Sequence, residues 1–292
     1  MNETPSSVRP SSAHPQKFLV TGATGTVGRQ LVAALTAAGH EVRALTRDAA
    51  RAADLPPGAE AYVGDLTDPE TLAGAFEGVT GVHLITFGGP YFTPLETAPR
   101  LLELARAAGV RRVTVLHGGG ETPLEDAVRA ADDLDWTVLM PVEFMANALE
   151  WADGIATTGA VREPFTDRKS AMVHEADIAA VAATALTEDG HGGREYLITG
   201  PEVLTVTDKA AILAAARGAR IDVVELSETE AVEEWRAAGQ PEDLIEFLLD
   251  VYGNTPEVGR TVADTVEKVT GRPARTFAEW AAAHASAFAA RP

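Results

Sequence analysis

Three glycines, spaced three residues apart, follow the first apolar segment of the chain. Gly22, Gly25 and Gly28 lie in the run Thr-Gly-Ala-Thr-Gly-Thr-Val-Gly, directly after the β-rich segment Phe18–Thr21. Residues 27–39 then have the four-residue apolar spacing of an amphipathic helix that ends at a glycine. In such a turn the first glycine permits the tight bend, the second lets a pyrophosphate approach the backbone, and the third lets helix and strand pack closely. The pattern therefore predicts a dinucleotide-binding loop at a helix N-terminus.

The same glycines could instead form a tight strand-to-helix turn that holds no ligand. The position of the motif between a strand and a helix favours the dinucleotide interpretation, because the binding motif requires this context. We expect the loop to contact the cofactor through Gly22, Thr24, Gly25, Thr26, Val27 and Gly28.

The residue at the end of the second predicted strand indicates which nicotinamide dinucleotide is bound. An acidic residue there holds the ribose hydroxyls of NAD, whereas an arginine holds the additional phosphate of NADP. The chain has Arg47 at this position, with Arg43 on the same face of the strand, so we predict a preference for NADP(H). Asp48 is adjacent, which leaves NAD(H) open as a second cofactor, and a solvated Arg47 is the alternative.

Two histidines are candidates for acid–base chemistry. His117 follows the predicted strand Val113–Leu116, and ligands of parallel sheets bind at the carboxyl ends of strands. An imidazole titrates in the range that a general acid needs near neutral pH. The alternative is a histidine that only bonds to its glycine-rich loop. His174 precedes a predicted helix and is the second candidate, with a local bond to backbone near Asp177 as its other interpretation.

Other polar residues are assigned supporting roles or none. Tyr91, Thr93 and Glu143 lie near predicted loop edges and are expected to line the ligand site. His83 lies within a predicted strand and is interpreted as structural. No grouping of His, Asp and Glu has metal-ligand spacing, so we predict no metal.

Short β-rich segments alternate with helical segments along the first half of the chain. This alternation predicts right-handed βαβ crossovers and a Rossmann-type, doubly wound parallel sheet with helices on both faces, an α/β fold. After the first strand, strands are predicted near Val42–Thr46, Ala61–Gly64, Val82–Thr86, Val113–Leu116 and Thr137–Met140, and helices around Ala49–Asp54, Pro69–Phe76, Leu95–Ala108 and Leu124–Ala131.

The order of elements changes after Pro141. Helices are predicted at Asp177–Leu186, Asp208–Arg217 and Glu228–Ala238, and strands at Glu195–Thr199 and Ile221–Leu226, with further helices to the end. The first residues are rich in serine and proline and lack the apolar core of a secretory signal. We therefore predict a disordered leader at residues 1–16, a nucleotide-binding core at 17–150, and a smaller, mostly helical substrate lobe at 151–292 that is interleaved with the last sheet strands.

The composition restricts the partners and the compartment. A formal net charge of −19 would repel a phosphate backbone and anionic lipid, so we predict no nucleic-acid or membrane partner. No run of about 18 apolar residues is available to span a bilayer. The chain has no cysteine, which excludes disulfides, thiolate metal sites and catalytic thiols. We expect a cytoplasmic protein that acts on a small molecule, and leave its oligomeric state open.

Several further motifs give the chain a family resemblance. The glycine spacing resembles that of the extended and atypical short-chain dehydrogenases/reductases, and the other motifs resemble their NmrA-like branch. These motifs are Gly64-Asp65-Leu66, Gly109-Val-Arg-Arg-Val113, Leu134-Asp-Trp-Thr-Val-Leu-Met-Pro141, Val142-Glu-Phe-Met-Ala-Asn147 and Val173-His-Glu-Ala-Asp-Ile-Ala179.

The resemblance implies roles for two more pairs of residues. It places Asp65 and Leu66 along the adenine, and Thr86 and Phe87 beside the nicotinamide ribose. Most members of the superfamily reduce carbonyls with a tyrosine and a lysine four residues later. The residues four positions after the four tyrosines of this chain are Leu66, Leu95, Gly200 and Pro256, so the Tyr-Lys pair is absent.

The resemblance implies two classes of function. The first is an NADPH-dependent reductase that transfers hydride to a carbonyl, a ketone or quinone, of a mainly apolar, aromatic small molecule. Relatives include quinone reductases, triphenylmethane-dye reductases and ketoreductases of aromatic polyketide antibiotic biosynthesis, some without the Tyr-Lys pair. The proton would then come from a histidine, a water or the substrate itself. The second is an NAD(P)-sensing regulatory protein without turnover, in which the pair has been lost.

Overall fold

The computed structural model describes residues 15–88 and 93–290. Most of the predicted leader at residues 1–16, and the predicted lining residue Tyr91, lie outside the described residues. Among the described residues, no helix is long and apolar enough to cross a membrane.

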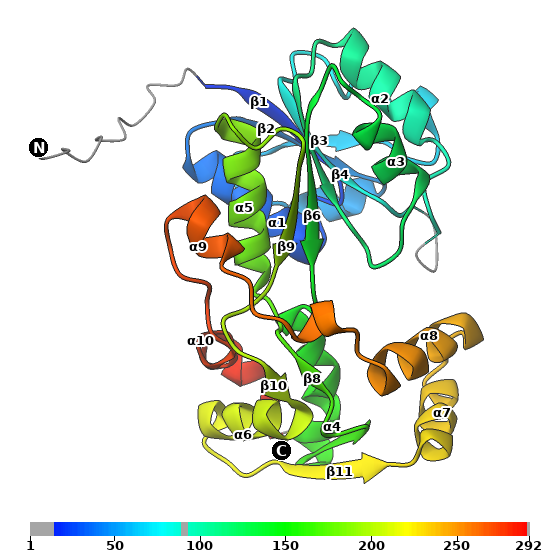
Figure 1. The fold of residues 1–292 in the computed structure, drawn as a ribbon, viewed down its shortest axis with the longest axis vertical. Helices are drawn as coiled ribbons and strands as arrows, with labels where there is room; N and C mark the ends of the chain where they lie inside the picture. Colours follow the sequence, from blue (N-terminus) through cyan, green and yellow to red (C-terminus); the bar gives the residue numbers. More distant parts are fainter. Residues whose placement is uncertain (1–14, 89–92, 291–292) are drawn as a thin grey trace, which may run out of the picture.

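A seven-stranded sheet in the order β3-β2-β1-β4-β5-β6-β9 forms the centre of the larger lobe (Figure 1). All of its neighbouring strands are parallel, so the predicted Rossmann-type doubly wound fold is confirmed. The strands are β1 (Lys17–Val20), β2 (Glu41–Thr46), β3 (Glu60–Val63), β4 (Gly81–Ile85), β5 (Arg112–Leu116), β6 (Asp135–Pro141) and β9 (Arg194–Ile198).

Helices cover both faces of this sheet and bury two separate apolar clusters. On one face lie α1 (Thr26–Ala37), α5 (Glu175–Thr187) and α9 (Thr265–Thr270), and α1 packs along α5. On the other face lie α2 (Ala98–Ala107) and α3 (Pro123–Arg129). The apolar spacing of α1 places Leu31 and Leu35 on its buried side, where both are fully buried.

Three predicted helices differ from the structure. The segments η1 (Ala49–Asp54) and η2 (Pro69–Leu72) are short 3-10 helices, of which η1 buries no residue and η2 buries only Leu72. The predicted helix at Leu95–Ala108 begins only at Ala98. Leu95 is buried and its N–H donates to the carbonyl of Thr86, which holds it in the connection that leaves β4.

The smaller lobe combines helices with two pairs of short strands. Strand β7 (Ala160–Pro164) pairs in parallel with β11 (Asp222–Leu226), and β8 (Lys169–Ser170) pairs antiparallel with β10 (Leu204–Thr205). The helical segments are η3 (Met145–Trp151), α4 (Ala152–Thr158), α6 (Val206–Arg217), α7 (Glu228–Ala237), α8 (Glu242–Gly253), η4 (Glu257–Arg260), α10 (Phe277–Ala283) and η5 (Ala285–Phe288).

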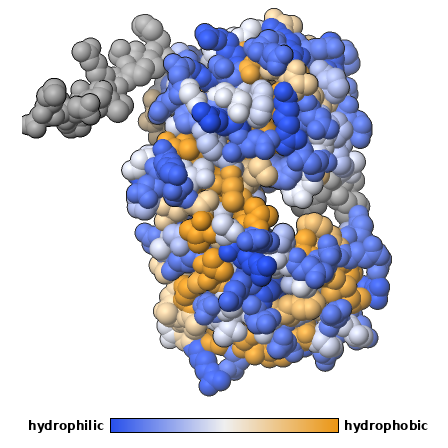
Figure 2. Space-filling model, viewed as in Figure 1, coloured by the Kyte–Doolittle hydropathy of each residue, from blue (hydrophilic) through white to orange (hydrophobic). Residues whose placement is uncertain are grey.

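The smaller lobe has a core of its own, centred on aromatic side chains. Trp280 is buried and stacks on Phe277 at a centroid distance of 5.5 Å, while Phe288 meets its edge. Figure 2 shows the molecule hollowed between the two lobes, with hydrophobic side chains exposed on the smaller lobe beside the hollow.

Candidate active site

The central sheet has a topological switch point beside β1, because β2 lies on one side of this strand and β4 on the other. Ligands of open α/β sheets bind outside the carboxyl ends of the strands at such a point. A cavity of about 530 Å³ lies there. It is lined by Gly22, Thr24, Gly25, Leu45, Thr46, Arg47, Asp48, Arg51, Gly64, Asp65, Leu66, Ile85, Phe87 and Gly88.

Gly22 and Gly28 are needed for the shape of the loop. Gly22 has a φ of 60°, a conformation that favours glycine. A Cβ atom at Gly28 would overlap the carbonyl oxygen of Gly22, so the helix could not approach the strand. Gly25 precedes α1, whose first turn has neither a side-chain cap nor an acidic residue. The first N–H groups of α1 are therefore available to an anion, which fits a pyrophosphate.

The other predicted cofactor residues fall into two groups. Thr24, Arg47, Asp65, Leu66 and Phe87 line the 530 Å³ cavity with the glycines. The remainder do not line the cavity: Thr26, Val27 and Gly28 form the first turn of α1, and Thr86 is buried with its hydroxyl 3.4 Å from the carbonyl of Leu116. Their contacts with a cofactor stay predictions.

Arg43 has a structural role and is not available to a phosphate. Its guanidinium forms an ion pair with Glu60 at 3.1 Å and donates to the backbone carbonyls of Gly74 and Ala75. It lies near the start of β2, away from the carboxyl end, so proximity to Arg47 in the sequence was misleading.

Arg51 is a cavity residue that the sequence interpretation missed. It lies in η1, four residues after Arg47, and its Nη2 donates to the carbonyl of Thr24 at 3.5 Å. This contact places a second guanidinium, in addition to that of Arg47, beside the glycine loop. Arg47 lies before η1 and shares no helical face with Arg51; the bend between β2 and η1 brings both to the cavity.

A second cavity, of about 280 Å³, opens between the lobes and contains His117. A Cβ atom at Gly118 would overlap the ring of Phe87, so that ring packs against the backbone that follows His117. Because Phe87 lines the first cavity and His117 and Gly119 line the second, the two cavities adjoin at this contact.

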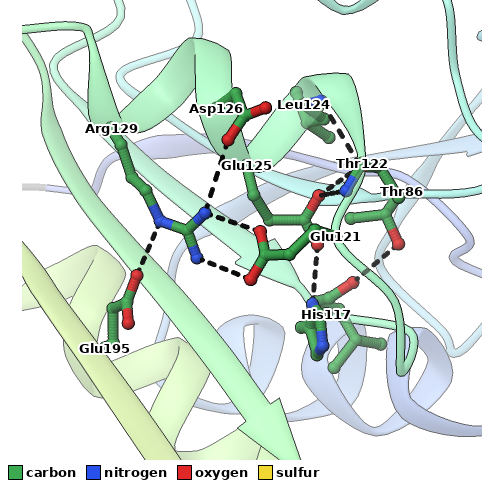
Figure 3. Close-up of polar contacts among 10 residues, drawn as sticks. Thr86, His117, Glu121, Thr122, Leu124, Glu125, Asp126, Arg129 and Glu195 are labelled. Atoms are coloured by element: carbon green, nitrogen blue, oxygen red, sulfur yellow. Dashed lines mark hydrogen bonds and ion pairs between the residues drawn. The ribbon is translucent and has the colours of Figure 1, made fainter.

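His117 is held by a buried carboxylate (Figure 3). Its Nδ1 lies 2.8 Å from Oε1 of Glu125, whose side chain is fully buried. The other carboxylate oxygen accepts from the backbone N–H and the hydroxyl of Thr122, the residue that caps α3. Despite its burial, the pKa of Glu125 is lowered by the hydrogen bonds from His117 and Thr122.

The same hydrogen bond raises the pKa of His117 above its ordinary value, against the effect of burial. Because Glu125 is an acceptor only, Nδ1 carries a hydrogen and donates it. No partner for Nε2 is found among residues 15–88 and 93–290, and the side chain lines the second cavity. The imidazole is thus oriented with one nitrogen committed and the other available to a ligand.

His174 has a local role. It precedes α5, and its Nδ1 accepts a hydrogen bond from the backbone N–H of Ala176 at 3.0 Å. Burial lowers its pKa. It lines neither cavity, so the structure gives it the capping role that was the alternative to catalysis.

The second cavity has an apolar wall and a polar wall. Met140, Pro141, Leu197, Phe247, Val251 and Val258 contribute apolar surface. The polar wall contains the predicted lining residue Glu143, together with Arg168, Ser170 and Tyr252, which sequence reasoning missed. Thr93, also predicted to line the site, is exposed and lines neither cavity.

The chain resembles known proteins along most of its length. Residues 22–123 match a family described as NAD(P)H-binding. The chain is 37% identical to an NAD(P)H azoreductase of Xenophilus azovorans, over 94% of this chain and 99% of the relative. It is also 37% identical to a (4-alkanoyl-5-oxo-2,5-dihydrofuran-3-yl)methyl phosphate reductase of Streptomyces griseus, over 93% of this chain and 99% of that protein.

These alignments span both lobes, so they include the residues that line both cavities. The chain belongs to the NmrA-like atypical short-chain dehydrogenases/reductases. Within this family of NAD(P)H-binding oxidoreductases, an NADPH-dependent quinone oxidoreductase of Escherichia coli, solved with NADPH, superposes with a TM-score of 0.76 at 26% identity. The superposition covers 91% of this chain and 99% of that structure.

Proposed function

We propose that the protein is an NADPH-dependent reductase that transfers hydride to a carbonyl carbon, in a ketone or quinone, of a mainly apolar, aromatic small molecule. The observation that carries this proposal is the contact of Phe87 with Gly118, where the glycine-loop cavity adjoins the cavity of His117. A substrate in the second cavity would therefore lie beside a dinucleotide held in the first.

The residues present fit the cofactor. The glycine loop and the first turn of α1 would hold the pyrophosphate, and Leu66 and Asp65 would border the adenine. Arg47 and Arg51 would hold the additional phosphate of NADP, which is why NADP(H) is preferred over NAD(H) in this proposal. When bound, NADPH supplies the hydride.

His117 is the proton donor in this proposal. A carbonyl oxygen gains negative charge as its carbon accepts hydride, and a protonated imidazole that faces the cavity can neutralise it. Glu125 fixes the ring and favours its protonated form. The N–H at Nε2 is the hydrogen that would be transferred, because Nδ1 is bonded to Glu125. Water or a substrate hydroxyl is the alternative source.

The test is turnover of NADPH by the purified protein, followed through the loss of reduced-cofactor absorbance. The panel contains quinones, polycyclic aromatic ketones of the polyketide type and an azo dye, because the relatives are reductases of several electrophiles. Activity on a carbonyl substrate supports the proposal. Tight NADPH binding by calorimetry without turnover of any panel member contradicts it and favours an NAD(P)-sensing regulatory protein.

A further inference from the structure

Three polar side chains meet on the wall of the second cavity, outside the proposed proton-transfer machinery. Glu143 follows β6, Ser170 lies in β8 and Lys209 reaches them from α6. Oε2 of Glu143 accepts from Nζ of Lys209 at 2.8 Å and from the hydroxyl of Ser170. Lys209 also donates to Oγ of Ser170 at 2.9 Å.

The contacts among these three side chains determine the protonation states of Glu143 and Lys209. Burial raises the pKa of Glu143, but Lys209, the hydrogen bond from Ser170 and the charge of Arg168 together outweigh burial, and the net effect lowers this pKa. The carboxylate is therefore ionised near neutral pH and can only accept hydrogen bonds. Burial lowers the pKa of Lys209, while Glu143 favours its charged form. The ion pair leaves this part of the wall with little net charge.

One oxygen of Glu143 is left for a ligand. Ser170 and Lys209 both donate to Oε2 of the carboxylate, and Oε1 has no partner within the described ranges 15–88 and 93–290. The side chain is 21% exposed and lines the cavity, whereas Lys209 is fully buried. An ionised carboxylate oxygen that faces an apolar cavity is a strong acceptor, because water there is restricted.

Two charged neighbours of this group, Glu163 and Arg168, are paired with each other. Oε1 of Glu163 accepts from Trp151, and Oε2 of Glu163 accepts from Arg168 at 3.1 Å. The guanidinium of Arg168 lies 3.8 Å from the ring centroid of Tyr252 and also donates to the carbonyl of Pro164. Burial raises the pKa of Tyr252, so its phenol stays neutral.

We propose that Oε1 of Glu143 is a substrate-recognition site for a neutral hydrogen-bond donor, a phenolic hydroxyl or an arylamine N–H. This inference rests on the proposed reductase function and narrows its substrates to aromatic carbonyl compounds that carry such a donor away from the reacting carbon. A neutral donor is favoured over a cation because Lys209 already balances the carboxylate. An ether or an ionised phenol at this position would leave Oε1 without a donor.

The first test measures binding and needs no turnover. Calorimetry with the NADP⁺-saturated protein compares β-naphthol with its methyl ether, which lacks the donor and carries one additional methyl group. A hydrogen bond to a charged acceptor predicts a preference for β-naphthol of about ten- to 150-fold. Glu143→Gln should reduce this preference to within about three-fold, an expectation based on the weaker neutral acceptor. Lys169→Gln, which also changes a charge on the cavity wall, is the matched control and should retain it.

Glu143→Gln leaves Lys209 without its carboxylate, so a second variant guards against misfolding. The double variant Glu143→Gln/Lys209→Met removes both charges together and should show the same loss of preference with a cooperative melting transition. Equal binding of the two naphthalenes by the unaltered protein overturns the inference. A preference that persists in both Glu143 variants, but disappears in His117→Ala or Tyr252→Phe, also overturns it and identifies that residue as the acceptor of the naphthol hydroxyl.

The second test separates this inference from the proposed function. Turnover of a tetralone with a ring hydroxyl is compared with turnover of its methyl ether. Faster kcat/KM for the hydroxyl compound, lost in Glu143→Gln, supports the inference. Equal turnover of both compounds contradicts the recognition site but leaves the reductase intact. A Glu143-dependent preference in binding, with no turnover of any carbonyl compound, supports the recognition site and contradicts the reductase.

Discussion

The imidazole of His117 is oriented by the carboxylate of Glu125, whose own position is fixed by its surroundings. Glu125 is buried, its second oxygen is occupied by Thr122, and its position in α3 is fixed by the cap of that helix. Figure 3 shows that Arg129, also on α3, is itself bonded to Glu121 and Glu195 and does not compete for Glu125. A general acid needs this combination of fixed direction and elevated pKa.

If His117 is the acid, His117→Ala should lower kcat by about 10²–10⁴ and leave NADPH affinity within a few-fold. His117→Gln should not restore turnover, because an amide cannot donate a proton to an alkoxide. Steady-state kinetics and calorimetry provide the two measurements. His174→Ala is the matched control, since it removes a histidine that only caps α5. Near-normal turnover in His117→Ala would assign the proton to water or to the substrate.

The bond to Glu125 also predicts a pH dependence. The hydrogen bond that His117 donates to Glu125 raises the pKa of His117, so the protonated form persists above the ordinary value of 6.5 and is lost as the pH rises through the raised pKa. We expect kcat/KM to fall over that alkaline range. Glu125→Gln removes the charged partner, and burial then lowers the pKa, so the fall should begin at lower pH. An unchanged pH profile in Glu125→Gln would show that the pair of His117 and Glu125 does not control proton transfer.

Arg47→Ala should weaken NADPH binding and leave NADH binding nearly unchanged, because only NADPH carries the additional phosphate. Loss of a charge-assisted hydrogen bond of about 1.5–3 kcal/mol predicts a ten- to 150-fold weaker Kd. Calorimetry with each cofactor measures this difference. Arg51→Ala should show the same selectivity, because Arg51 lines the same end of the cavity. Equal losses for both cofactors would refute the phosphate assignment.

At the scale of elements, the turn between β1 and α1 is the part of the fold most closely tied to its ligand. Gly25→Val should abolish dinucleotide binding while the protein stays folded. A Cβ atom at Gly25 would lie 3.1 Å from the carbonyl oxygen of Gly22, so the backbone tolerates it, but a branched side chain would fill the space in front of α1. Calorimetry measures the cofactor affinity and circular dichroism shows whether the variant is folded. A folded variant that retains its affinity would mean that the loop is only a structural turn.

Most elements of the larger lobe could be predicted, because each carries the signal of its structure within its own residues. Strand β1 and helix α1 carry apolar residues at the period of their own structure and are separated by glycines. In the smaller lobe, β11 was predicted, as the strand Ile221–Leu226, but the other short strands carry no such local signal. Strand β7 is formed only through pairing with β11, which is distant in the sequence, and β8 and β10 have two residues each. Their pairing is set by tertiary contacts.

The polar contacts on the wall of the second cavity could not be predicted for the same reason, although Glu143 itself was expected to line the site. Lys209 lies in an alanine-rich helix and has the sequence context of a solvated lysine, yet it is fully buried. Its partners Glu143 and Ser170 come from other elements. His117, by contrast, directly follows a recognisable strand, so its place at the carboxyl edge of the sheet could be predicted.

At the scale of the whole molecule, the substrate cavity depends on the way the two lobes are joined. Glu143 extends from the end of β6 in the larger lobe, and α6 belongs to the smaller lobe, so the ion pair of Glu143 with Lys209 links them. The ion pair of Arg275 with Asp177 adds a second link, between α5 and the segment that leads into α10. The cavity walls are therefore fixed relative to each other by buried polar contacts.

Lys209→Met should destabilise the protein by about 3–5 kcal/mol, because it leaves the carboxylate of Glu143 in a largely buried position without its cation. Denaturant unfolding at neutral pH measures the loss. The double variant Lys209→Met/Glu143→Leu should recover most of it, since removing both charges also removes the cost of desolvating them. Lys268→Met, at an exposed ion pair with Asp264, is the control and should change stability by less than about 1 kcal/mol. If Lys209→Met changed the free energy of unfolding as little as this control, the ion pair of Lys209 with Glu143 would not be what joins the lobes. The shape of the cavity would then depend on apolar contacts between the lobes.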